Sequence, residues 1–360
     1  MKFNWKFWQI NWKFWQKSPY VTADEERWTK RLRGSIGLAT ASLVGVYVLA
    51  VVIVGWWWSY EPDLFDPVAA AEERARNEGV QPVTGYTTAA TVVALTEVLL
   101  DKRGGYLSND ILPPGLYLDN VPSWEFGVLT HLRDISRALR HDLSRSQSQS
   151  AEDPDLAEAE GHFFYDNSSW IFPATEHELN KGATRIAEYA SRLADPASED
   201  TQFYARADNL ARWLQGVETR LGDISQRLSQ SVGKRQLHLG LAGDPTATMA
   251  TDAARETETR TSWFEIDDVF YEARGQAWAL YHLLRAVEHD FGPVLDDKNA
   301  RVSLRQIIRE LEATQATIWS PMILNGGGFG FLANHSLVIA SYVSRVNAAI
   351  IDLRDLLDKG

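Results

Sequence analysis

One long apolar run near the start of the chain interrupts an otherwise mixed pattern of hydrophobic and polar positions. Residues 36–58, IGLATASLVGVYVLAVVIVGWWW, contain no charged side chain. As a helix rising 1.5 Å per residue, this run would be roughly 34 Å long, enough to cross a hydrocarbon core of about 30 Å. Trp56, Trp57 and Trp58 end the run as an aromatic belt, and Trp28 marks its other side. The pattern predicts a single transmembrane helix over residues 36–58.

After residue 60, apolar positions repeat at spacings of three and four in one segment after another. This period places one narrow apolar seam on each helix, which is typical of antiparallel bundles. No run alternates convincingly as a strand would, so we expect an all-α protein, with the transmembrane helix followed by an antiparallel helical-bundle extracytoplasmic domain. The predicted seams are Leu179, Ala183, Ile186, Ala190 and Leu193; Phe203, Ala207, Leu210, Leu214, Val217, Leu221, Ile224 and Leu228; Ile266, Phe270, Ala273, Ala277, Leu280, Leu284 and Val287; Leu304, Ile308, Leu311, Gln315 and Ile318; and Ile339, Tyr342, Val346, Ala349, Leu353 and Leu356.

The connections between these segments predict how the body is organised. The first two seams are joined by ADPASEDTQ, in which Pro196 stops one helix and Ser198 or Asp200 can cap the next, so residues 175–232 are predicted as a long helical hairpin. Residues 144–155 and 241–261 are polar or rich in small residues and are predicted as loops. Since no piece between them carries enough seams to bury a core alone, residues 60–360 are expected to form one domain.

The net charge of −12 is unevenly distributed and predicts an orientation. Residues 1–35 carry +5, the apolar run carries nothing, and the rest of the chain carries −17. Basic residues before the run and acidic residues after it place the N-terminal tail in the cytoplasm and the body outside. A cleaved signal peptide is the alternative, but the basic region and the apolar run are both too long for one. So acidic a body repels phosphate and is not expected to bind nucleic acid.

The basic tail, residues 1–35, begins with a duplicated heptad, NWKFWQINWKFWQ over residues 4–16. On a helix, Trp5, Trp8, Trp12 and Trp15 form one stripe with lysines on the far side, which is the arrangement of a helix lying on an anionic membrane surface. A disordered tail and a helix docked in a partner's groove are the two alternatives. The lipid bilayer is therefore an expected partner of both the tail and the span.

The sequence gives no recognisable catalytic constellation. There is no cysteine, and the eight histidines lack metal-ligand spacing: the HE of TEHELNKG is followed by Lys181 where a zinc protease needs its second histidine. The glycine-rich NGGGFGF at 325–331 lacks the lysine of a phosphate-binding loop and is interpreted as a hinge. Glu265, Asp267, Asp268 and Glu272 are either a cation site or a charged helix start. We expect no catalytic residue, no metal and no cofactor.

The most informative candidate for binding is the stretch 113–150. Val128, Leu132, Ile135, Leu139 and Leu143 form its buried face, and Arg133, Arg137 and Arg140 share another face. Three guanidiniums in an acidic body can hold a phosphate or carboxylate, or can be solvated or paired internally with residues such as Asp134 and Asp142. A binding pocket here would also be lined by Tyr106, Asp110, Asn120 and Trp124.

Several stretches together carry a resemblance to a known family. They are GGYLSNDILPPG, DNVPSWEFGVL, LRDISRALRHDLSRSQSQS and GFLANHS, in a chain with a basic tail and a single span that ends in tryptophans. The chain resembles, over most of residues 20–360, a proteobacterial family of uncharacterised single-span inner-membrane proteins, a domain of unknown function. The doubled heptad is not a feature of that family. The resemblance implies a Gram-negative inner-membrane protein with its body in the periplasm.

Two functions remain open from the sequence. The first is a membrane-anchored scaffold, adaptor or accessory subunit of an envelope complex, which implies an envelope protein partner or self-association. The second is an envelope enzyme or anionic-ligand-binding module with its site near residues 104–140. A sensor is less favoured, because about 35 cytoplasmic residues leave no room for an output domain.

Overall fold

The computed structural model describes residues 23–146, 151–198, 200–236, 257–320, 322–326 and 332–359. The chain divides into two compact units, Met1–Val54 and Gly55–Gly360. The duplicated heptad with Trp5, Trp8, Trp12 and Trp15 lies outside the described residues, so its helical stripe stays a prediction.

The first helix, α1 (Ala23–Trp58), contains the predicted apolar run. Its segment Lys30–Trp58 has a mean hydropathy of 2.4 over its most apolar window, and none of that window is buried inside the protein. The hydroxyl groups of Ser35 and Thr40 donate to the carbonyls of Leu32 and Ile36 within the same helix, so they need no water. By length and composition α1 qualifies as a membrane anchor or a signal sequence.

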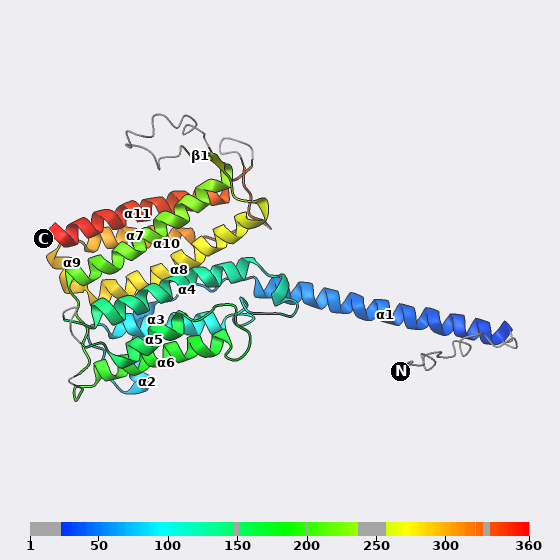
Figure 1. The fold of residues 1–360 in the computed structure, drawn as a ribbon, viewed down its shortest axis with the longest axis horizontal. Coiled ribbons are helices and arrows are strands. Elements are labelled where there is room, and N and C mark those ends of the chain that lie inside the picture. Colours follow the sequence, from blue (N-terminus) through cyan, green and yellow to red (C-terminus); the bar gives the residue numbers. More distant parts are fainter. Residues whose placement is uncertain are drawn as a thin grey trace, which may run out of the picture. The chain divides into compact units, whose positions relative to one another are not determined.

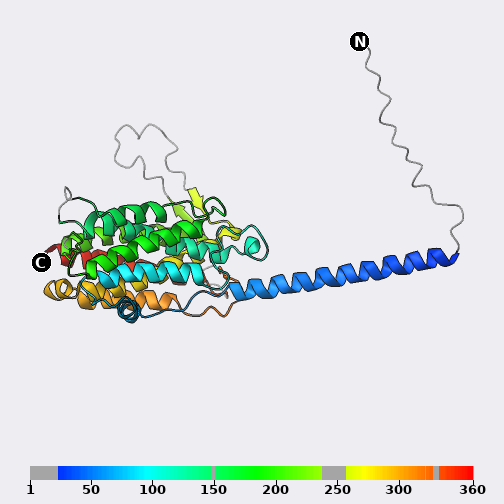
Figure 2. The ribbon, with the colours of Figure 1, turned by 90° about the horizontal axis from the view of Figure 1, so that it is seen from below.

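The body, residues 55–360, is a bundle of helices in three groups (Figures 1 and 2). Helices α4 (Asn120–Ala138) and α8 (Ile266–Asp290) lie side by side in the middle. On one side are α2 (Pro67–Glu78), α3 (Tyr86–Asp101), α5 (Pro154–Phe163) and α6 (Thr175–Ala194); on the other are α7 (Ala207–Ser229), α10 (Arg301–Thr314) and α11 (His335–Lys359). A short helix, α9 (Gly292–Asp297), joins α8 to α10.

The two central helices approach closely because each has a glycine at the crossing. A Cβ atom on Gly127 of α4 would lie 2.2 Å from the carbonyl oxygen of Glu272, and one on Gly275 of α8 would lie 2.0 Å from that of Trp124. Beside the crossing, the indoles of Trp124 and Trp278 pack with ring centroids 5.2 Å apart. Any larger residue at either glycine would push the helices apart, so the pair fixes the centre of the bundle.

The predicted all-α class is confirmed. The described residues are mainly helical, and the buried face predicted for α4 is confirmed, since Val128, Leu132, Ile135 and Leu139 are fully buried. Two three-residue strands, β1 (Lys234–Gln236) and β2 (Thr257–Thr259), pair antiparallel between α7 and α8, with Arg235 opposite Glu258. This two-stranded ladder belongs to the connection between α7 and α8 and does not change the fold class.

The predicted hairpin over residues 175–232 is wrong. Helix α6 packs on α3 and α5, whereas α7 packs on α11, so the two helices belong to different sides of the bundle. Their connection, residues 195–206, runs without helix up to α7, which begins at Ala207 rather than after Ser198 or Asp200. The backbone N–H of Tyr204 donates to the carbonyl of Leu143 at 2.6 Å, which holds this connection across the end of α4. The spacing of apolar residues predicted both helices but could not show where the connection led.

The last predicted seam is shifted around its helix. In α11 the fully or nearly fully buried positions are Ile339, Val343, Val346, Ile350, Leu353 and Leu357, while Leu356 is exposed and Tyr342 and Ala349 are half-buried. Two apolar faces of α11 follow the same three-four spacing, so periodicity alone cannot choose between them. The helix is also apolar enough to pass for a membrane span, but it packs against α7 and α10 inside the bundle.

The loops that connect the helices alternate between the two ends of the bundle. The described parts of the connections 102–119, 164–174, 230–265 and 315–334 lie at the end that also holds residues 55–66, here called the proximal end. The described parts of the connections 79–85, 139–153, 195–206 and 291–300 lie at the other, distal end. This alternation decides which loops can form a common surface.

Candidate functional site at the proximal end

The segment that follows α1, residues 59–66, lies along α8 instead of hanging free. Its Glu61 accepts three hydrogen bonds from the guanidinium of Arg274: Nε to both carboxylate oxygens at 2.9 Å, and Nη2 to Oε2 at 2.5 Å. Nη1 of Arg274 donates to the carbonyls of Thr314 at 2.8 Å and Ala316 at 3.0 Å. Arg274 is 5% exposed, so this charge is buried and fully engaged. One guanidinium thus joins the segment after α1 to α8 and to the end of α10.

Two further contacts attach the same segment to α8. Trp278 Nε1 lies 3.4 Å from the carbonyl oxygen of Asp63, and the backbone N–H of Phe65 donates to Nε2 of His282 at 3.1 Å. The Phe65 ring stacks on the His282 imidazole with centroids 4.1 Å apart. His282 Nδ1 lies 2.7 Å from the carbonyl of Trp278 and donates to it, which leaves Nε2 as the acceptor. We call Glu61, Asp63 and Phe65 with their partners Arg274, Trp278 and His282 the linker clamp.

Two buried histidines give the body a predictable response to acid. Burial lowers the pKa of His282 and of His131, each to about 4. His131 lies on α4, is fully buried, and has no hydrogen-bond partner for either ring nitrogen. Between about pH 6.5 and pH 4, these two histidines are protonated in the unfolded state but stay neutral in the folded state. The free energy of unfolding therefore falls as the pH falls from about 6.5 towards 4.

We expect this loss to reach about 3 kcal/mol per histidine at the acidic end of that range. Urea denaturation at pH 7.5 and pH 5.0 measures the part lost by pH 5.0, which is about 2 kcal/mol per histidine. His131→Leu should remove part of the pH dependence at little cost at neutral pH, because no hydrogen bond is lost. His177→Leu, at an exposed position of α6, is the matched control and should leave the pH dependence unchanged. A His131→Leu protein that stays as acid-sensitive as the parent contradicts the assignment.

A cleft of about 560 Å³ opens beside the linker clamp. It lies between the end of α1, α8 and the residues that follow α10, with Trp56, Tyr60, Tyr271 and Gln315 among its lining residues. Burial raises the pKa of Tyr271 to about 12, so its hydroxyl keeps its proton at neutral pH. Arg274 and Glu61, which form part of its wall, neutralise each other. The cleft therefore marks the place where three segments of the body meet and offers no unpaired charge from this ion pair to a ligand.

The loop 102–119 is folded around a second buried ion pair. Glu125 is fully buried and accepts hydrogen bonds from Lys102 Nζ, from the backbone N–H groups of Leu107 and Ser108 at 2.8 Å each, and from the Ser108 hydroxyl at 2.5 Å. Burial raises the pKa of the Glu125 carboxyl, and the Lys102 ammonium and the other donors oppose that rise. This pair fixes the GGYLSND segment on the start of α4.

The four residues predicted to line a pocket near this loop have separate roles. Tyr106 is buried and its hydroxyl donates to the carbonyl of Asn167 at 2.9 Å, while Trp124 is fully buried against Trp278. Asp110 is half-buried beside Gly115, where a Cβ atom would lie 1.9 Å from Oδ2 of Asp110. Asn120 is the first residue of α4, and its backbone N–H donates to the carboxylate of Asp119 at 3.0 Å. At Tyr106 and Trp124 the surface is therefore filled, and binding by these residues stays a prediction.

All three arginines of the predicted stripe have partners within the protein. Arg133 donates to the carbonyls of Phe163 and Tyr165 at 2.8 Å each, where α5 ends. Arg137 lies 3.1 Å from Glu160, and Arg140 binds Glu160 at 2.9 Å and Glu152 at 2.6 Å. Internal pairing was one of the predicted alternatives, with Asp134 and Asp142 as the suggested partners. The acidic partners in the structure are instead Glu160 of α5 and Glu152 of the loop before it. Asp134 and Asp142 pair instead with Arg220 and Arg212 of α7.

Within this stripe, Arg133 should matter most for stability. Arg133→Ala leaves two carbonyls at the end of α5 without their donor, which we expect to cost about 1–2 kcal/mol of unfolding free energy. Arg137→Ala is the matched comparison: its side chain is 53% exposed, and its loss should cost less than about 1 kcal/mol. Urea denaturation of both variants checks the order, and equal losses would contradict the capping role.

The acidic residues at the start of α8 separate into different contacts. Glu272 forms a two-point ion pair with Arg227 of α7 at 2.7 and 2.6 Å, and Asp268 accepts from the Ser123 hydroxyl at 2.9 Å. Burial raises the pKa values of Asp267 and Asp268. Within the described ranges, no group of three or more histidine or acidic side chains is placed to hold a metal ion.

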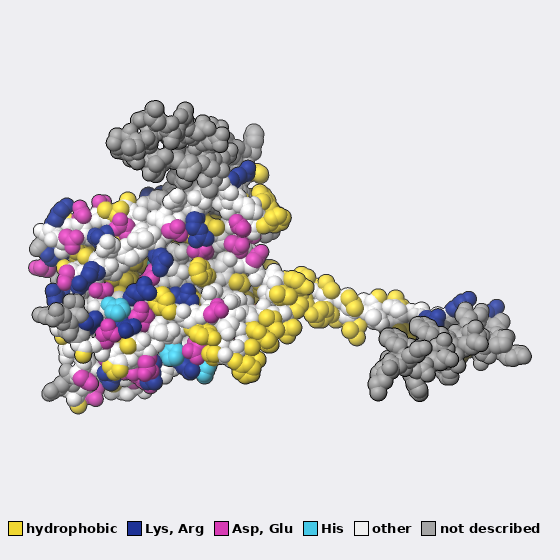
Figure 3. All heavy atoms as spheres, in the orientation of Figure 1, with side chains coloured by type: hydrophobic (Ala, Val, Ile, Leu, Met, Phe, Trp, Pro, Cys, Tyr) yellow, Lys and Arg dark blue, Asp and Glu magenta, His cyan; other side chains and the backbone are white. Residues whose placement is uncertain are grey.

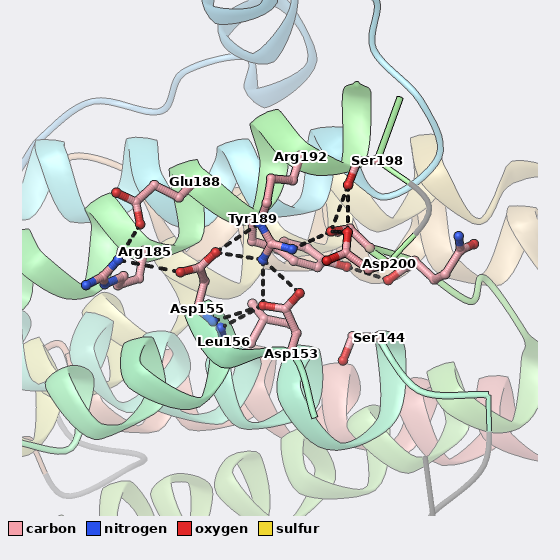
Figure 4. A network of polar contacts seen from close by, with 12 residues as sticks. Ser144, Asp153, Asp155, Leu156, Arg185, Glu188, Tyr189, Arg192, Ser198 and Asp200 are labelled. Atoms are coloured by element: carbon pink, nitrogen blue, oxygen red, sulfur yellow. Dashed lines mark hydrogen bonds and ion pairs between the residues drawn. The ribbon is translucent and has the colours of Figure 1, made fainter. Parts of the chain in front are cut away.

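A second polar network lies at the distal end (Figure 4). Arg192 of α6 donates to Asp153 at 2.9 and 2.8 Å, to Asp155 at 3.0 and 2.6 Å, and to the Thr201 hydroxyl at 2.5 Å. Asp153 also caps α5 by accepting from the N–H groups of Asp155 and Leu156. The network joins α5, α6 and the connection to α7, and its role is structural.

The clamp, the bundle and the apolar helix define the class: an all-α bundle protein with an N-terminal helix suited to a membrane anchor or a signal sequence. The chain belongs to a bacterial family described as uncharacterised conserved proteins (DUF2333), whose family model matches residues 31–360. The predicted resemblance is thereby confirmed. No curated protein and no solved structure matches the chain.

Neither of the two buried ion pairs at the proximal end, Glu61–Arg274 and Lys102–Glu125, was predicted from the sequence. For the second pair, however, the position of Glu125 in the sequence indicates that a partner is needed. Glu125 precedes Val128 by three residues and Leu132 by seven, so it falls on the predicted buried face of α4, where a carboxylate needs a partner. The partner, Lys102, is 23 residues away. Glu61 and Arg274 are 213 residues apart, and nothing local in either segment points to the other.

Proposed function

We propose that this protein is a single-span scaffold or adaptor of the bacterial inner membrane, with its body in the periplasm and an envelope protein as its partner. The linker clamp carries the proposal. A body on a flexible tether could face in any direction, whereas residues 59–66 are fixed on α8 at three successive points. A partner bound to such a body is held at a set distance from the end of α1, which is what an adaptor requires.

The charge distribution supports the proposed orientation. The segment RWTKRLRGS before the apolar run is basic, and SYEPDLFDP after it contains three acidic residues and no basic one. This bias favours a cytoplasmic N-terminus and a body outside the cytoplasm. In this arrangement, the tryptophan stripe of residues 1–35 would lie on the inner leaflet, on the opposite side of the membrane from the body.

The alternative of an anionic-ligand module near residues 104–140 has less support. A phosphate or carboxylate at Arg137 and Arg140 would have to displace Glu160 and Glu152. Displacing a carboxylate by another anion gains little, because one charge-assisted contact replaces a similar one. The adaptor role uses the geometry as it stands.

Photo-crosslinking in native membranes tests the adaptor role. A photoreactive residue is placed in turn at exposed positions of α6, α7, α10 and α11, and the adducts are identified by mass spectrometry. We expect adducts with one and the same envelope protein from neighbouring positions on one face. A matched variant carries Glu61→Gln and a flexible insertion after Trp58, and it should lose these adducts while remaining in the membrane. Adducts with lipids alone at every position would contradict an adaptor.

A further inference from the structure

The loops of the proximal end form one continuous surface. The hydroxyl of Tyr106 and the side chain of Asn109 donate to the carbonyls of Asn167 and Ser169, which joins the connections 102–119 and 164–174. Arg274 joins residues 314–316 to Glu61. Asn325 donates to the carbonyl of Ser231, which joins the connections 315–334 and 230–265. The guanidinium of Arg103 lies over the ring of Tyr60, 5.2 Å from its centroid, which joins the connection 102–119 to residues 55–66, so the described parts of the four connections and residues 55–66 are held as a unit.

Large apolar side chains stand exposed on all four of these connections. Phe172 is 90% exposed, Phe264 83%, Trp319 92% and Tyr117 72%. Tryptophan and the other aromatic residues recur among them, together with aliphatic neighbours. The full set, here called the apolar end surface, is Ile111, Leu112, Leu116, Tyr117, Trp170, Ile171, Phe172, Trp263, Phe264, Trp319, Met322 and Leu332. Soluble domains rarely gather so many exposed apolar side chains in one place unless the surface binds something.

Some stretches of these loops are nearly free of charge. Residues 313–344 contain no lysine, arginine, aspartate or glutamate, and residues 104–118 and 164–174 contain one aspartate each, Asp110 and Asp166. The remaining proximal connections are charged: 102–119 carries four charged residues in all and 230–265 carries nine, against four in the distal connection 195–206 and three in 291–300. Figure 3 shows hydrophobic side chains gathered at the proximal end, with acidic side chains between them near the start of α8, and charged side chains spread over the helical flank. Burying the charge-poor stretches 104–118, 164–174 and 313–344 would therefore strip water from few charges.

We propose that the apolar end surface lies in the interfacial layer of the lipid bilayer, so that the body rests on the membrane as well as being anchored in it. The inference rests on the proposed membrane anchoring by α1. Chain connectivity selects lipid as the occupant. Gly55–Trp58, the end of the apolar run, belong to the same compact unit as the four loops, and a Cβ atom on Gly55 would lie only 3.3 Å from Cβ of Pro114. Tryptophan, tyrosine and phenylalanine at loop tips are the residues that favour the lipid–water interface.

Depth-dependent fluorescence quenching of the full-length chain in lipid vesicles tests this. Because the chain contains no cysteine, single cysteines can be introduced and labelled without other changes. The reporting positions are Tyr117→Cys, Phe172→Cys, Phe264→Cys and Trp319→Cys, all exposed, so folding should be unaffected. Lipids carrying a nitroxide near the headgroup should quench each of these labels at least about twofold more than a label at the distal end.

Two controls separate failure of this inference from failure of the anchoring. Val302→Cys, 75% exposed at the start of α10 on the distal end, reports quenching away from the membrane. Val48→Cys, near the middle of the apolar run, reports insertion of α1 when the lipids carry the nitroxide deep in the acyl chain. If the label at 48 is quenched and the four loop labels match the one at 302, the apolar end surface faces a protein instead and the inference is overturned. If the label at 48 is not quenched, the anchoring itself is refuted.

Discussion

Replacing Glu61 by alanine is expected to lower the free energy of unfolding of the body by about 3 kcal/mol or more. The reason is that Arg274 stays buried with its charge while its carboxylate partner is removed. The two carbonyl acceptors of Thr314 and Ala316 remain, but they cannot neutralise a buried guanidinium. Urea denaturation of the detergent-solubilised full chain, followed by circular dichroism, measures the loss.

Hydrogen exchange provides a second readout for the same variant. The N–H of Phe65 is protected by His282, so in Glu61→Ala we expect it to exchange at least about tenfold faster as the linker clamp opens. Arg285→Ala is the matched control on the same helix: its pair with Asp66, at 3.7 Å, is exposed and should be worth less than about 1 kcal/mol. If Glu61→Ala also lowers the unfolding free energy by less than about 1 kcal/mol, and the exchange rate of the Phe65 N–H is unchanged, the clamp does not hold the segment.

Replacing Glu125 by alanine should be at least as damaging, with an expected loss of about 3–5 kcal/mol. The substitution leaves the Lys102 ammonium buried without a counter-charge and the N–H groups of Leu107 and Ser108 without an acceptor. The loop 102–119 should loosen with it, because these bonds hold the loop on α4. Thermal denaturation and urea titration of the variant measure the effect.

A double variant distinguishes charge burial from loss of packing. Lys102→Met with Glu125→Gln removes both charges but keeps an amide oxygen that can accept from the loop. We expect it to recover about half of the loss or more, because neutral pairs avoid the cost of an unmatched buried charge. If the double variant is as unstable as Glu125→Ala, the ion pair is not the source of the effect.

The helices and their buried faces could be predicted from the sequence because they follow from the spacing of apolar residues. The apolar run of α1 and the seams of α6, α7, α8 and α10 depend on spacing within one helix, and most of the predicted seam positions are buried. In α11 the same rule was right for Ile339, Val346 and Leu353 but not for the other half of the seam, because a second apolar row, including Val343, Ile350 and Leu357, has equal spacing. Spacing defines a face of a helix but not which neighbour covers it.

The errors and omissions concern contacts between distant segments. The hairpin of α6 and α7 was predicted from a short connection, but Tyr204 pairs with Leu143 and directs the chain to the other side of the bundle. The arginine stripe was found from its spacing on α4, yet its partners Glu152 and Glu160 come from another helix and the loop before it. The apolar end surface is assembled from loops up to about 200 residues apart, and only the alternation of loop ends brings them together.

The location of the C-terminus relative to the membrane tests the account most directly. Alkaline phosphatase, which is active only outside the cytoplasm, and a green fluorescent protein that folds only inside it are each fused after Gly360 of the full chain. We predict an active phosphatase fusion, a dark fluorescent fusion, and a chain that stays with the membranes after an alkaline carbonate wash. A fluorescent fusion with an inactive phosphatase, or a chain released by the wash, would contradict a body held outside the cytoplasm by a membrane-spanning α1.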